Sequence, residues 1–353
     1  MDLTISSKWK TLPAWGKRSV VIVFVALIIF GNWSYKRYNA VFRPNIRKSG
    51  MIYIPTGSGF EQLLDSLKRG QYLIDSKTFQ WVASRKNFDK KVQPGAYMIK
   101  KGWNNNQLIN LLRSGIQTPV KVTFNNIRLR EDLAGRLSHY LEPDSTQFYN
   151  ALNNEKIATD MGLTCESFPI IIIPNTYEIY WNTSPAEFIA RMKFEFDRFW
   201  STDRKNKAAQ WGLTPLQVVT IASIVQEESN KSDEKPRIAG VYINRIKHGW
   251  PLQADPTIKY ALGNFQLKRI LSKYLTIDSP YNTYKFAGLP PGPINFPDIA
   301  SVDAVLNAEH HNYMYFCAKE DFSGHHNFAQ TLAEHSRNAA RYQTALNRIK
   351  IWK

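Results

Sequence analysis

The sequence is short of cysteine, and this shortage excludes two kinds of stabilising site. Among its 353 residues the only cysteines are Cys165 and Cys317, which lie far apart without C-x-x-C spacing. Such a pair predicts neither a zinc site nor a disulfide framework. Two separately packed thiols are favoured, and a single bridge between them stays open.

Acidic residues are also scarce. The 29 Asp and Glu residues against 46 Lys and Arg leave a formal net charge of +17. So large an excess indicates an anionic partner, which could be nucleic acid, anionic lipid or an acidic polymer. No helix-turn-helix, zinc-finger or RNA-binding aromatic pattern accompanies the charge, which disfavours nucleic acid. We therefore expect a membrane surface or an acidic polymer, and no nucleic acid.

Several catalytic signatures are missing as well. There is no G-x-S-x-G nucleophile turn and no phosphate-binding glycine loop. The C-terminal histidines lack H-E-x-x-H spacing and tight pairing with carboxylates; they are His310, His311, His325, His326 and His335. We therefore expect no metal ion and no cofactor, with His326 and His335 anchoring loops or contacting a substrate.

One long hydrophobic run is present near the N-terminus. Val20–Phe30 carries no charge and is flanked by Trp15 and Trp33, as is typical of a membrane span with aromatic residues at its interfaces. The sequence predicts a transmembrane helix over residues 19–35. A cleaved signal peptide would need a small-x-small site after the run, and a buried core helix would need a polar face. Basic residues lie on both sides of the run, so charge alone does not orient it.

The rest of the chain predicts an α+β protein. The hydrophobic content of 43% and the aromatic content of 13% are sufficient for real cores. The module, with helices at Phe60–Arg69 and Ser76–Arg85 between two short strands, resembles LysM-like glycan-binding domains in size and order. Farther along, the apolar run Phe168–Ile173 predicts a strand. The expected parts are a tail over 1–18, a basic stalk over 36–48, the βααβ module over 49–118, a middle α+β region over 119–210 and a catalytic domain over 211–353.

The stretch that organises the last part opens with a helix start signal. Thr214 can cap the helix, Pro215 suits its first position, and Gln217 completes a capping box. Apolar residues then follow at helical spacing, namely Val218, Ile221, Ile224 and Val225. They predict an amphipathic helix that runs to about Glu228.

Two adjacent glutamates at the end of this helix fall on different faces. Glu228 continues the apolar face, whereas Glu227 follows Thr220 and Ser223 and is expected on a wetter face. A carboxyl held against apolar surroundings has a raised pKa and can act as a general acid near neutral pH. The alternative is that Glu228 lies at a frayed, solvated helix end.

The residues after this helix include a set typical of carbohydrate binding. Aromatic rings stack on sugar faces, and amide or carboxylate groups hydrogen-bond to sugar hydroxyls. The residues that could line such a groove are Gln253, Asp255, Tyr281, Asn282 and Tyr284. Each could instead be a loop residue whose polar groups are satisfied locally. The Leu-Pro-Pro-Gly-Pro run at 289–293 predicts a rigid groove wall or a turn.

Several motifs occur in an order that resembles a known family. They are Ser-Ile-Val-Gln-Glu-Glu-Ser at 223–229, Val-Tyr-Ile-Asn-Arg at 241–245, Leu-Gln-Ala-Asp-Pro-Thr at 252–257, Tyr-Asn-Thr-Tyr at 281–284 and Gly-Leu-Pro-Pro-Gly-Pro-Ile at 288–294. With the later His-Asn-Phe and Glu-His elements, they resemble the endolytic murein transglycosylases, the MltG or YceG-like family. The Ile-Pro-Asn-Thr-Tyr-Glu element at 173–178 is similar to that family's Phe-Pro-Asp-Thr-Tyr-Glu.

The resemblance implies positions for the site and for the chain. The family's catalytic Glu directly precedes Ser or Thr, which points to Glu228 beside Ser229. A preceding position that is often acidic in the family is Gln226 here. We expect substrate contacts from Ser229 and His326 in addition to the groove residues. The family further implies a single-pass inner-membrane protein with a short cytoplasmic tail, a LysM-like module and an extracytoplasmic catalytic domain.

The resemblance also implies a reaction. The family cleaves the β-1,4 bond between N-acetylmuramic acid and N-acetylglucosamine in peptidoglycan and leaves 1,6-anhydro ends, which would terminate nascent strands beside the peptidoglycan synthases. One alternative is a water-using muramidase with Asp255 as the second carboxylate. The other is a non-catalytic, membrane-tethered peptidoglycan-binding protein.

Overall fold

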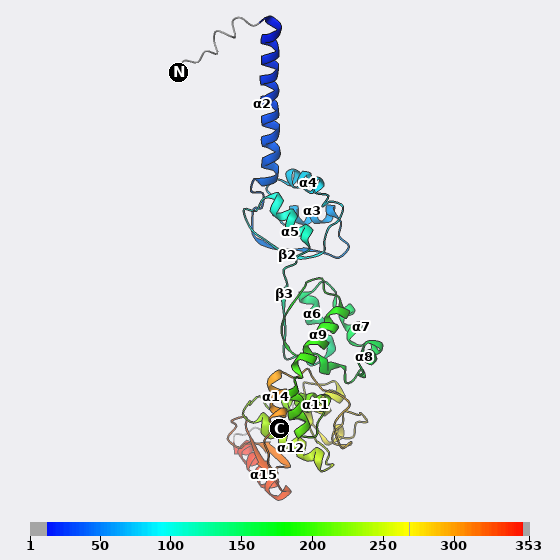
Figure 1. The fold of residues 1–353 in the computed structure, drawn as a ribbon. Coiled ribbons are helices and arrows are strands. Elements are labelled where there is room, and N and C mark those ends of the chain that lie inside the picture. The colour runs from blue at the N-terminus through cyan, green and yellow to red at the C-terminus, as the bar shows by residue number, and fades with distance from the viewer. Residues whose placement is uncertain (1–12, 268, 349–353) are drawn as a thin grey trace. The chain divides into compact units, whose positions relative to one another are not determined.

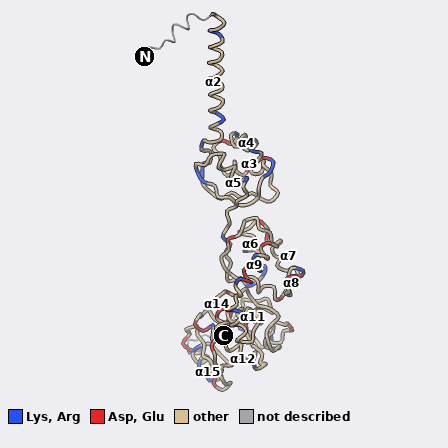
Figure 2. The backbone as a smooth tube through the Cα atoms, viewed as in Figure 1, with Lys and Arg blue, Asp and Glu red and all other residues tan. Residues whose placement is uncertain are grey.

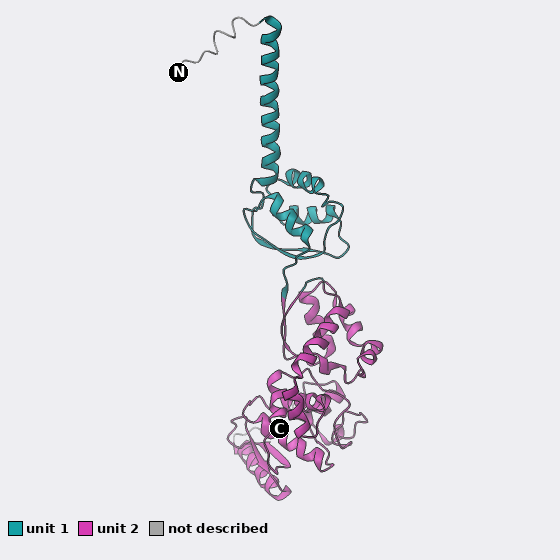
Figure 3. Cartoon of the chain, viewed as in Figure 1, with its two compact units in different colours: residues 1–120, 180–182 teal, residues 121–179, 183–353 magenta. Residues whose placement is uncertain are grey.

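The chain folds into two compact units. A computed structural model describes residues 13–267 and 269–348, so most of the expected tail and the last five residues of the expected catalytic domain lie outside the described part. The first unit comprises residues up to Val120 together with Tyr180–Asn182, and the second comprises Lys121–Ile179 and the chain from Thr183 onward (Figure 3). Helices and short antiparallel strands occur in both units, which confirms a mixed α+β fold.

The first unit begins with a long helix, α2, which spans Ala14–Phe42 (Figure 1). Its apolar side chains from Val20 to Phe30 are exposed, and its length and the mean hydropathy of 1.8 over its most apolar 18 residues suit a membrane span. The helix does not end at the predicted boundary near residue 35. It continues through the first half of the segment expected as a stalk, where Arg37 packs on the Trp81 ring of the module at 4.2 Å.

The module that follows has the predicted βααβ order. Strand β1 (Gly50–Ile54) pairs antiparallel with β2 (Gly95–Ile99), with Ile52 opposite Tyr97. The connecting helices are α3 (Phe60–Arg69) and α4 (Ser76–Arg85), and α5 (Asn105–Ser114) follows β2. Apolar faces of all three helices pack against the strands around one core, whose central side chains include Leu64, Phe79, Tyr97 and Leu108.

The second unit begins with a two-stranded sheet covered by helices. Strand β3 (Val120–Phe124) pairs with β4 (Asn175–Ile179). The Phe124 ring contacts Tyr177 and Phe188, and Phe148 contacts Phe188, so aromatic packing joins the sheet to its helices. The helices between the two strands in sequence are α6 (Arg130–Tyr140), α7 (Ser145–Leu152) and α8 (Glu155–Asp160), and α9 (Pro185–Phe199) follows β4. The next helix, α10 (Thr202–Gln210), packs against later helices of the unit.

The strand predicted over Phe168–Ile173 is wrong. The segment forms a short 3-10 helix, η1 (Phe168–Ile171), in which the Phe168 N–H donates to the Thr164 carbonyl at 2.9 Å. Pro169 has no N–H to give to a sheet and favours the helical φ. An apolar run this short is buried on every side, so its composition alone does not separate a strand from a helical turn.

The last part of the chain consists of helices, long loops and one hairpin. Cys317 lies in a strand of that hairpin, and both Cys317 and Cys165 are free thiols. Helix α11 (Pro215–Glu228) packs against α12 (Lys235–Lys247) and α14 (Ile299–Leu306). The remaining elements are α13 (Asp255–Leu262), η2 (Ser272–Tyr274), the antiparallel hairpin β5 (Tyr315–Ala318) and β6 (His326–Ala329), and α15 (Leu332–Arg348).

Candidate active site

The helix that carries the candidate acid starts as the sequence predicts. The Thr214 hydroxyl accepts the Gln217 N–H at 3.3 Å, and the Gln217 side chain accepts the Thr214 N–H at 2.8 Å. Pro215 occupies the first helical position. This reciprocal cap satisfies two N–H groups that a helix start leaves free. It therefore fixes where α11 begins, and Glu228 is the last residue of this helix.

Glu228 lies in an apolar environment with one strong polar partner. Its Oε1 accepts the hydroxyl hydrogen of Tyr242 at 2.6 Å, and Tyr242 comes from α12 and is buried. Burial raises the pKa of Glu228 to about 7, and the nearby Asp255 carboxylate adds to the rise, whereas the Tyr242 hydrogen bond and the charges of Arg245 and Lys259 oppose it. The residue as a whole is nevertheless only partly buried. A carboxyl in this environment can hold a proton near neutral pH and still reach a ligand.

Glu227 has a different environment from its neighbour. Its Oε2 forms an ion pair with Arg128 at 2.6 Å, and its Oε1 accepts a hydrogen from the Asn295 amide at 3.0 Å. The Arg128 guanidinium also lies over the Phe265 ring at 4.4 Å. Glu227 is thus held by protein partners on both oxygens, which suits a structural role.

The wetter face predicted for Glu227 is wrong. Thr220 and Ser223, which share that face, are both buried. The Ser223 hydroxyl accepts the Ile294 N–H at 3.0 Å, and the Ser223 carbonyl accepts the Asn295 amide at 3.0 Å. The proline-rich loop from later in the chain therefore covers this side of α11, and small hydroxyl residues face it because they can bond to its backbone.

Two of the predicted groove residues, Asp255 and Tyr284, lie near Glu228. Asp255 begins α13 and accepts the Tyr284 hydroxyl hydrogen at 2.5 Å. Burial and the Asp255 carboxylate raise the pKa of Tyr284, so its hydroxyl stays a donor. Gln253 is exposed, has a φ of +51°, and donates its N–H to the Thr283 carbonyl at 2.9 Å. This backbone bond joins the two segments that carry Asp255 and Tyr284.

Asn282 is placed differently from the other groove residues. It is fully buried, and its amide hydrogens go to the carbonyls of Leu275 and Ile277 at 2.9 and 2.8 Å. Its oxygen accepts the N–H groups of Tyr284 and Lys285 at 3.0 and 3.2 Å. All the donors and acceptors of the Asn282 side chain are therefore used within the loop that positions Tyr284.

Tyr281 lines a separate hollow. Its ring lies 4.6 Å from that of Tyr260 on α13. Both rings border a cavity of about 290 Å³, which also contains Arg128 and Arg130 among its lining residues. Burial raises the pKa of both tyrosines, so their hydroxyls remain available as donors.

Ser229 and His326 are tied to the protein rather than open. The Ser229 hydroxyl is buried and accepts the Lys231 N–H at 3.0 Å. His326 donates its backbone N–H to the buried Glu234 at 2.7 Å, and its Nδ1 lies 3.1 Å from the other oxygen of Glu234. The His326 ring contacts Phe316 edge-on, and Phe316 in turn contacts Tyr242. His326 therefore supports the layer behind Glu228.

Two residues of the site escaped the sequence analysis. Tyr242 enters the sequence analysis only as part of the motif at 241–245, although a buried tyrosine hydroxyl normally needs a partner. Arg245, one turn farther on α12, is buried and donates to the Met314 carbonyl at 2.8 Å and to the Leu252 carbonyl. Within the residues that the structure describes, no group of three His, Cys, Asp or Glu side chains could hold a metal ion.

Comparisons with known proteins identify the family of the chain. The model of the YceG-like family matches residues 52–341. An endolytic murein transglycosylase of Bacillus subtilis strain 168 is 29% identical over 84% of this chain and 85% of its own length. The endolytic murein transglycosylase of Streptococcus pneumoniae strain D39 is 25% identical over 91% of this chain, which spans 64% of that relative. A crystal structure of a YceG-like protein from Listeria monocytogenes superposes with a TM-score of 0.53 at 25% identity, covering 82% of this chain and 99% of the other. Since the family match takes in most of both units, the chain belongs to the YceG-like family.

Proposed function

We propose that the chain is an endolytic murein transglycosylase that cleaves the β-1,4 bond between N-acetylmuramic acid and N-acetylglucosamine within glycan strands. The relatives that bear this name support the general activity. The observation that carries the proposal is the state of Glu228, whose pKa burial raises to about 7 although the residue as a whole is only partly buried. This is the property that a general acid for glycosidic bonds requires.

Glu228 serves both halves of the reaction. It first protonates the glycosidic oxygen, so that the bond from the muramoyl C1 to this oxygen breaks and positive charge develops on the ring. The resulting carboxylate then takes the proton from the muramoyl C6 hydroxyl as that oxygen bonds to C1. The product is a 1,6-anhydro end, no water is consumed, and Glu228 is protonated again. A single carboxyl therefore suffices for the proton transfers.

The neighbouring groups have supporting roles. Tyr242 holds one oxygen of Glu228, so the proton to be transferred resides on the other, Oε2. The Asp255 carboxylate lies close enough to influence Glu228 and can stabilise positive charge on the sugar ring. Its short hydrogen bond from Tyr284 orients it. In the rival water-using mechanism, Asp255 would instead activate a water molecule.

The proposal extends to the location of the enzyme. We propose that α2 anchors the chain in the inner membrane as a single span, with the βααβ module and the second unit on the outer side. There the βααβ module is a LysM-like support, and the enzyme terminates nascent glycan strands near the peptidoglycan synthases. The apolar exposed surface of α2 supports the anchor, and the acidic character of peptidoglycan suits a chain of net charge +17.

The test is mass spectrometry of the products that purified full-length protein releases from glycan strands. We expect anhydromuramoyl ends with the wild type. Glu228→Gln should be slower by at least about 100-fold, because general acid catalysis contributes this much. Glu227→Gln is the matched control, since the amide can keep one oxygen toward Arg128, and it should retain most of the activity.

Each rival predicts a different product. A muramidase would give fragments heavier by one water with reducing ends, and a non-catalytic binding protein would retain glycan without cutting it. Full activity of Glu228→Gln would remove this residue from the mechanism.

A further inference from the structure

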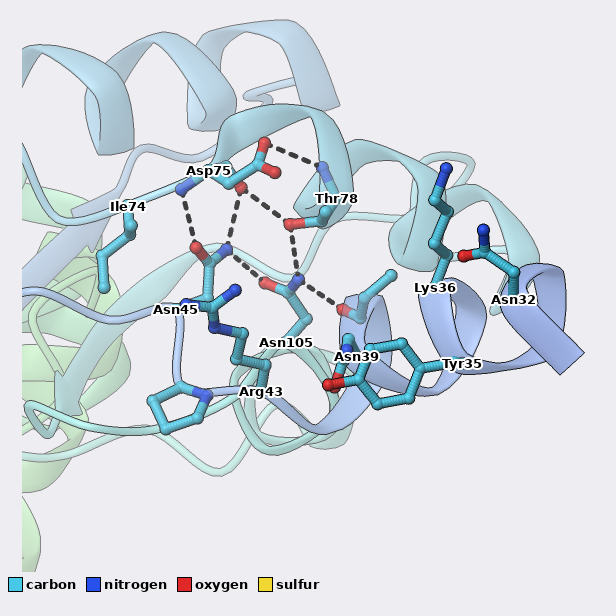
Figure 4. Close-up of a pocket in the computed structure, with 12 residues that line it drawn as sticks. Asn32, Tyr35, Lys36, Asn39, Arg43, Asn45, Ile74, Asp75, Thr78 and Asn105 are labelled. Carbon is cyan, nitrogen blue, oxygen red and sulfur yellow. Dashed lines mark hydrogen bonds between the residues drawn. The ribbon is translucent and has the colours of Figure 1, made fainter.

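A cavity of about 900 Å³ opens in the first unit, between the C-terminal half of α2 and the module (Figure 4). One wall comes from the helix and the segment after it, and the other from the start of α4 and from α5. The cavity is large enough for a small-molecule headgroup with the first part of a chain attached. Its lining residues are Asn32, Tyr35, Lys36, Asn39, Ala40, Arg43, Pro44, Asn45, Ile74, Asp75, Thr78 and Asn105.

The floor of the cavity is rigid. Asn45 and Asn105 are both buried, and the Asn45 amide donates to the Asn105 oxygen at 2.7 Å. Asn105 donates in turn to the carbonyl of Ala40 on α2 at 2.8 Å and to the Thr78 hydroxyl at 3.1 Å. Asn45 also accepts the Asp75 N–H at 2.7 Å. This network, drawn as dashed lines in Figure 4, joins the helix to the module and keeps the cavity formed without a ligand.

The charge in the cavity is not balanced. Lys36 and Arg43 both line it, and neither forms an ion pair with any acidic side chain in the part of the chain that the structure describes. The one carboxylate of the lining is Asp75, whose Oδ1 accepts the N–H groups of Lys77 and Thr78 at 2.8 and 3.2 Å as the cap of α4. Its charge is therefore partly offset by the helix start, and two cations remain for an outside anion.

The cavity lies where the apolar part of α2 ends. The apolar run ends at Phe30, and the first cavity residues, Asn32, Tyr35 and Lys36, follow it directly along the helix. Figure 2 shows basic residues at both ends of α2 and none along its middle. Exposed apolar and aromatic side chains occur close to the cavity, including Tyr38, Phe42 and Ile74. Such a boundary coincides with the headgroup layer of a bilayer that α2 would span.

We propose that this cavity binds the phosphate headgroup of a membrane phospholipid. Lys36 and Arg43 bind the phosphate, while Asn32 and Asn39 can bond to the ester and glycerol oxygens. The acyl chains leave along the exposed apolar face of α2. The proposal rests on the membrane span of the proposed function, and it is independent of the chemistry at Glu228. Two classes of phospholipid headgroup contain this phosphate. One is anionic, such as phosphatidylglycerol, and the other is zwitterionic, with an amine that would contact Asp75.

Native mass spectrometry of the full-length protein, extracted in mild detergent, tests the site. Phosphatidylglycerol, phosphatidylethanolamine and diacylglycerol with the same chains are added in turn, and the fraction with one bound lipid is measured. The test variant is Lys36→Gln with Arg43→Gln. The control is Arg47→Gln with Lys48→Gln, which removes the same charge from the same segment outside the cavity.

We expect one phospholipid per chain in the wild type and little diacylglycerol. The test variant should bind phospholipid about 10- to 30-fold more weakly, as expected for two basic groups near a lipid surface, and the control should bind as the wild type does. Tighter binding of phosphatidylglycerol identifies an anionic headgroup, and tighter binding of phosphatidylethanolamine identifies one that uses Asp75; both support the site.

Other results overturn the proposal. If phospholipid binding weakens equally in the test and control variants, the binding is due to general charge attraction and not to the cavity. If diacylglycerol binds as strongly as the phospholipids, the cavity does not recognise the phosphate. If no discrete bound lipid is detected, the cavity is not a lipid-binding site. Glycan cleavage measured on the same preparations separates this failure from failure of the proposed function, since the cavity variants leave Glu228 untouched.

Discussion

Replacing Glu228 by Gln should stabilise the protein at alkaline pH, although most substitutions destabilise. Burial raises the pKa of this carboxyl from 4.5 to about 7 in the folded chain, and unfolding restores the ordinary value. Between these two pH values the folded state holds a proton that the unfolded state has lost. The free energy of unfolding therefore falls as the pH rises through this window, and it stays at the lower level above about pH 7.

The size of the effect follows from the shift. A rise from 4.5 to about 7 corresponds to about 3 kcal/mol at 1.36 kcal/mol per pH unit. Because Glu228 as a whole residue is only partly buried, solvent screens part of this, so we expect about 1–2 kcal/mol. A Gln side chain has no charge to desolvate, and its oxygen can still accept the Tyr242 hydroxyl. Glu228→Gln should thus be more stable than the wild type by about 1–2 kcal/mol at pH 8.5, with little difference near pH 4.5.

Denaturant unfolding of the full-length protein at several pH values measures this difference. Glu227→Gln is the control, because it changes the adjacent carboxyl but weakens the ion pair with Arg128. It should give no gain at any pH. A Glu228→Gln variant that is less stable than the wild type at pH 8.5, or whose advantage does not depend on pH, would refute the argument that burial of Glu228 costs stability.

Two further predictions concern residues around the acid. Tyr242→Phe removes a hydrogen bond that lowers the pKa of Glu228, so the alkaline limb of the pH–rate profile should move up by about one pH unit; an unchanged limb would contradict the assigned contact. Asn282→Ala removes four bonds from a fully buried amide and should lower the free energy of unfolding by about 2–4 kcal/mol. Denaturant unfolding measures it, and a loss of cleavage without a loss of stability would instead place Asn282 against the substrate.

The sequence predicted the elements whose signals are local. The capping box of Thr214 and Gln217 forms as expected, because both partners lie within one helical turn. The helices Phe60–Arg69 and Ser76–Arg85 also form with the predicted bounds, since each has an apolar face and a clear start. The chain's place in the YceG-like family was likewise evident from short motifs in a fixed order.

The predictions that were wrong, and the features that were missed, depend on contacts between distant parts of the chain. The burial of Thr220 and Ser223 is due to a loop some seventy residues later, which hydrogen-bonds to Ser223, and no helical period can reveal such a cover. Helices α13 and α14 were not predicted because the first is short and the second follows a proline-rich loop. The Tyr242 contact with Glu228 likewise joins two helices whose packing angle the sequence does not give.

The bond from Asn105 to the carbonyl of Ala40 also has a mechanical consequence. It joins α2 to the module within the last turns of a helix that is unbroken from Ala14 to Phe42, so no hinge lies between the two. In a bilayer, a helix tilts to match the thickness of the hydrocarbon layer. Any such tilt would then turn the module as well. The thickness of the bilayer would therefore influence how this part of the enzyme is oriented above the membrane.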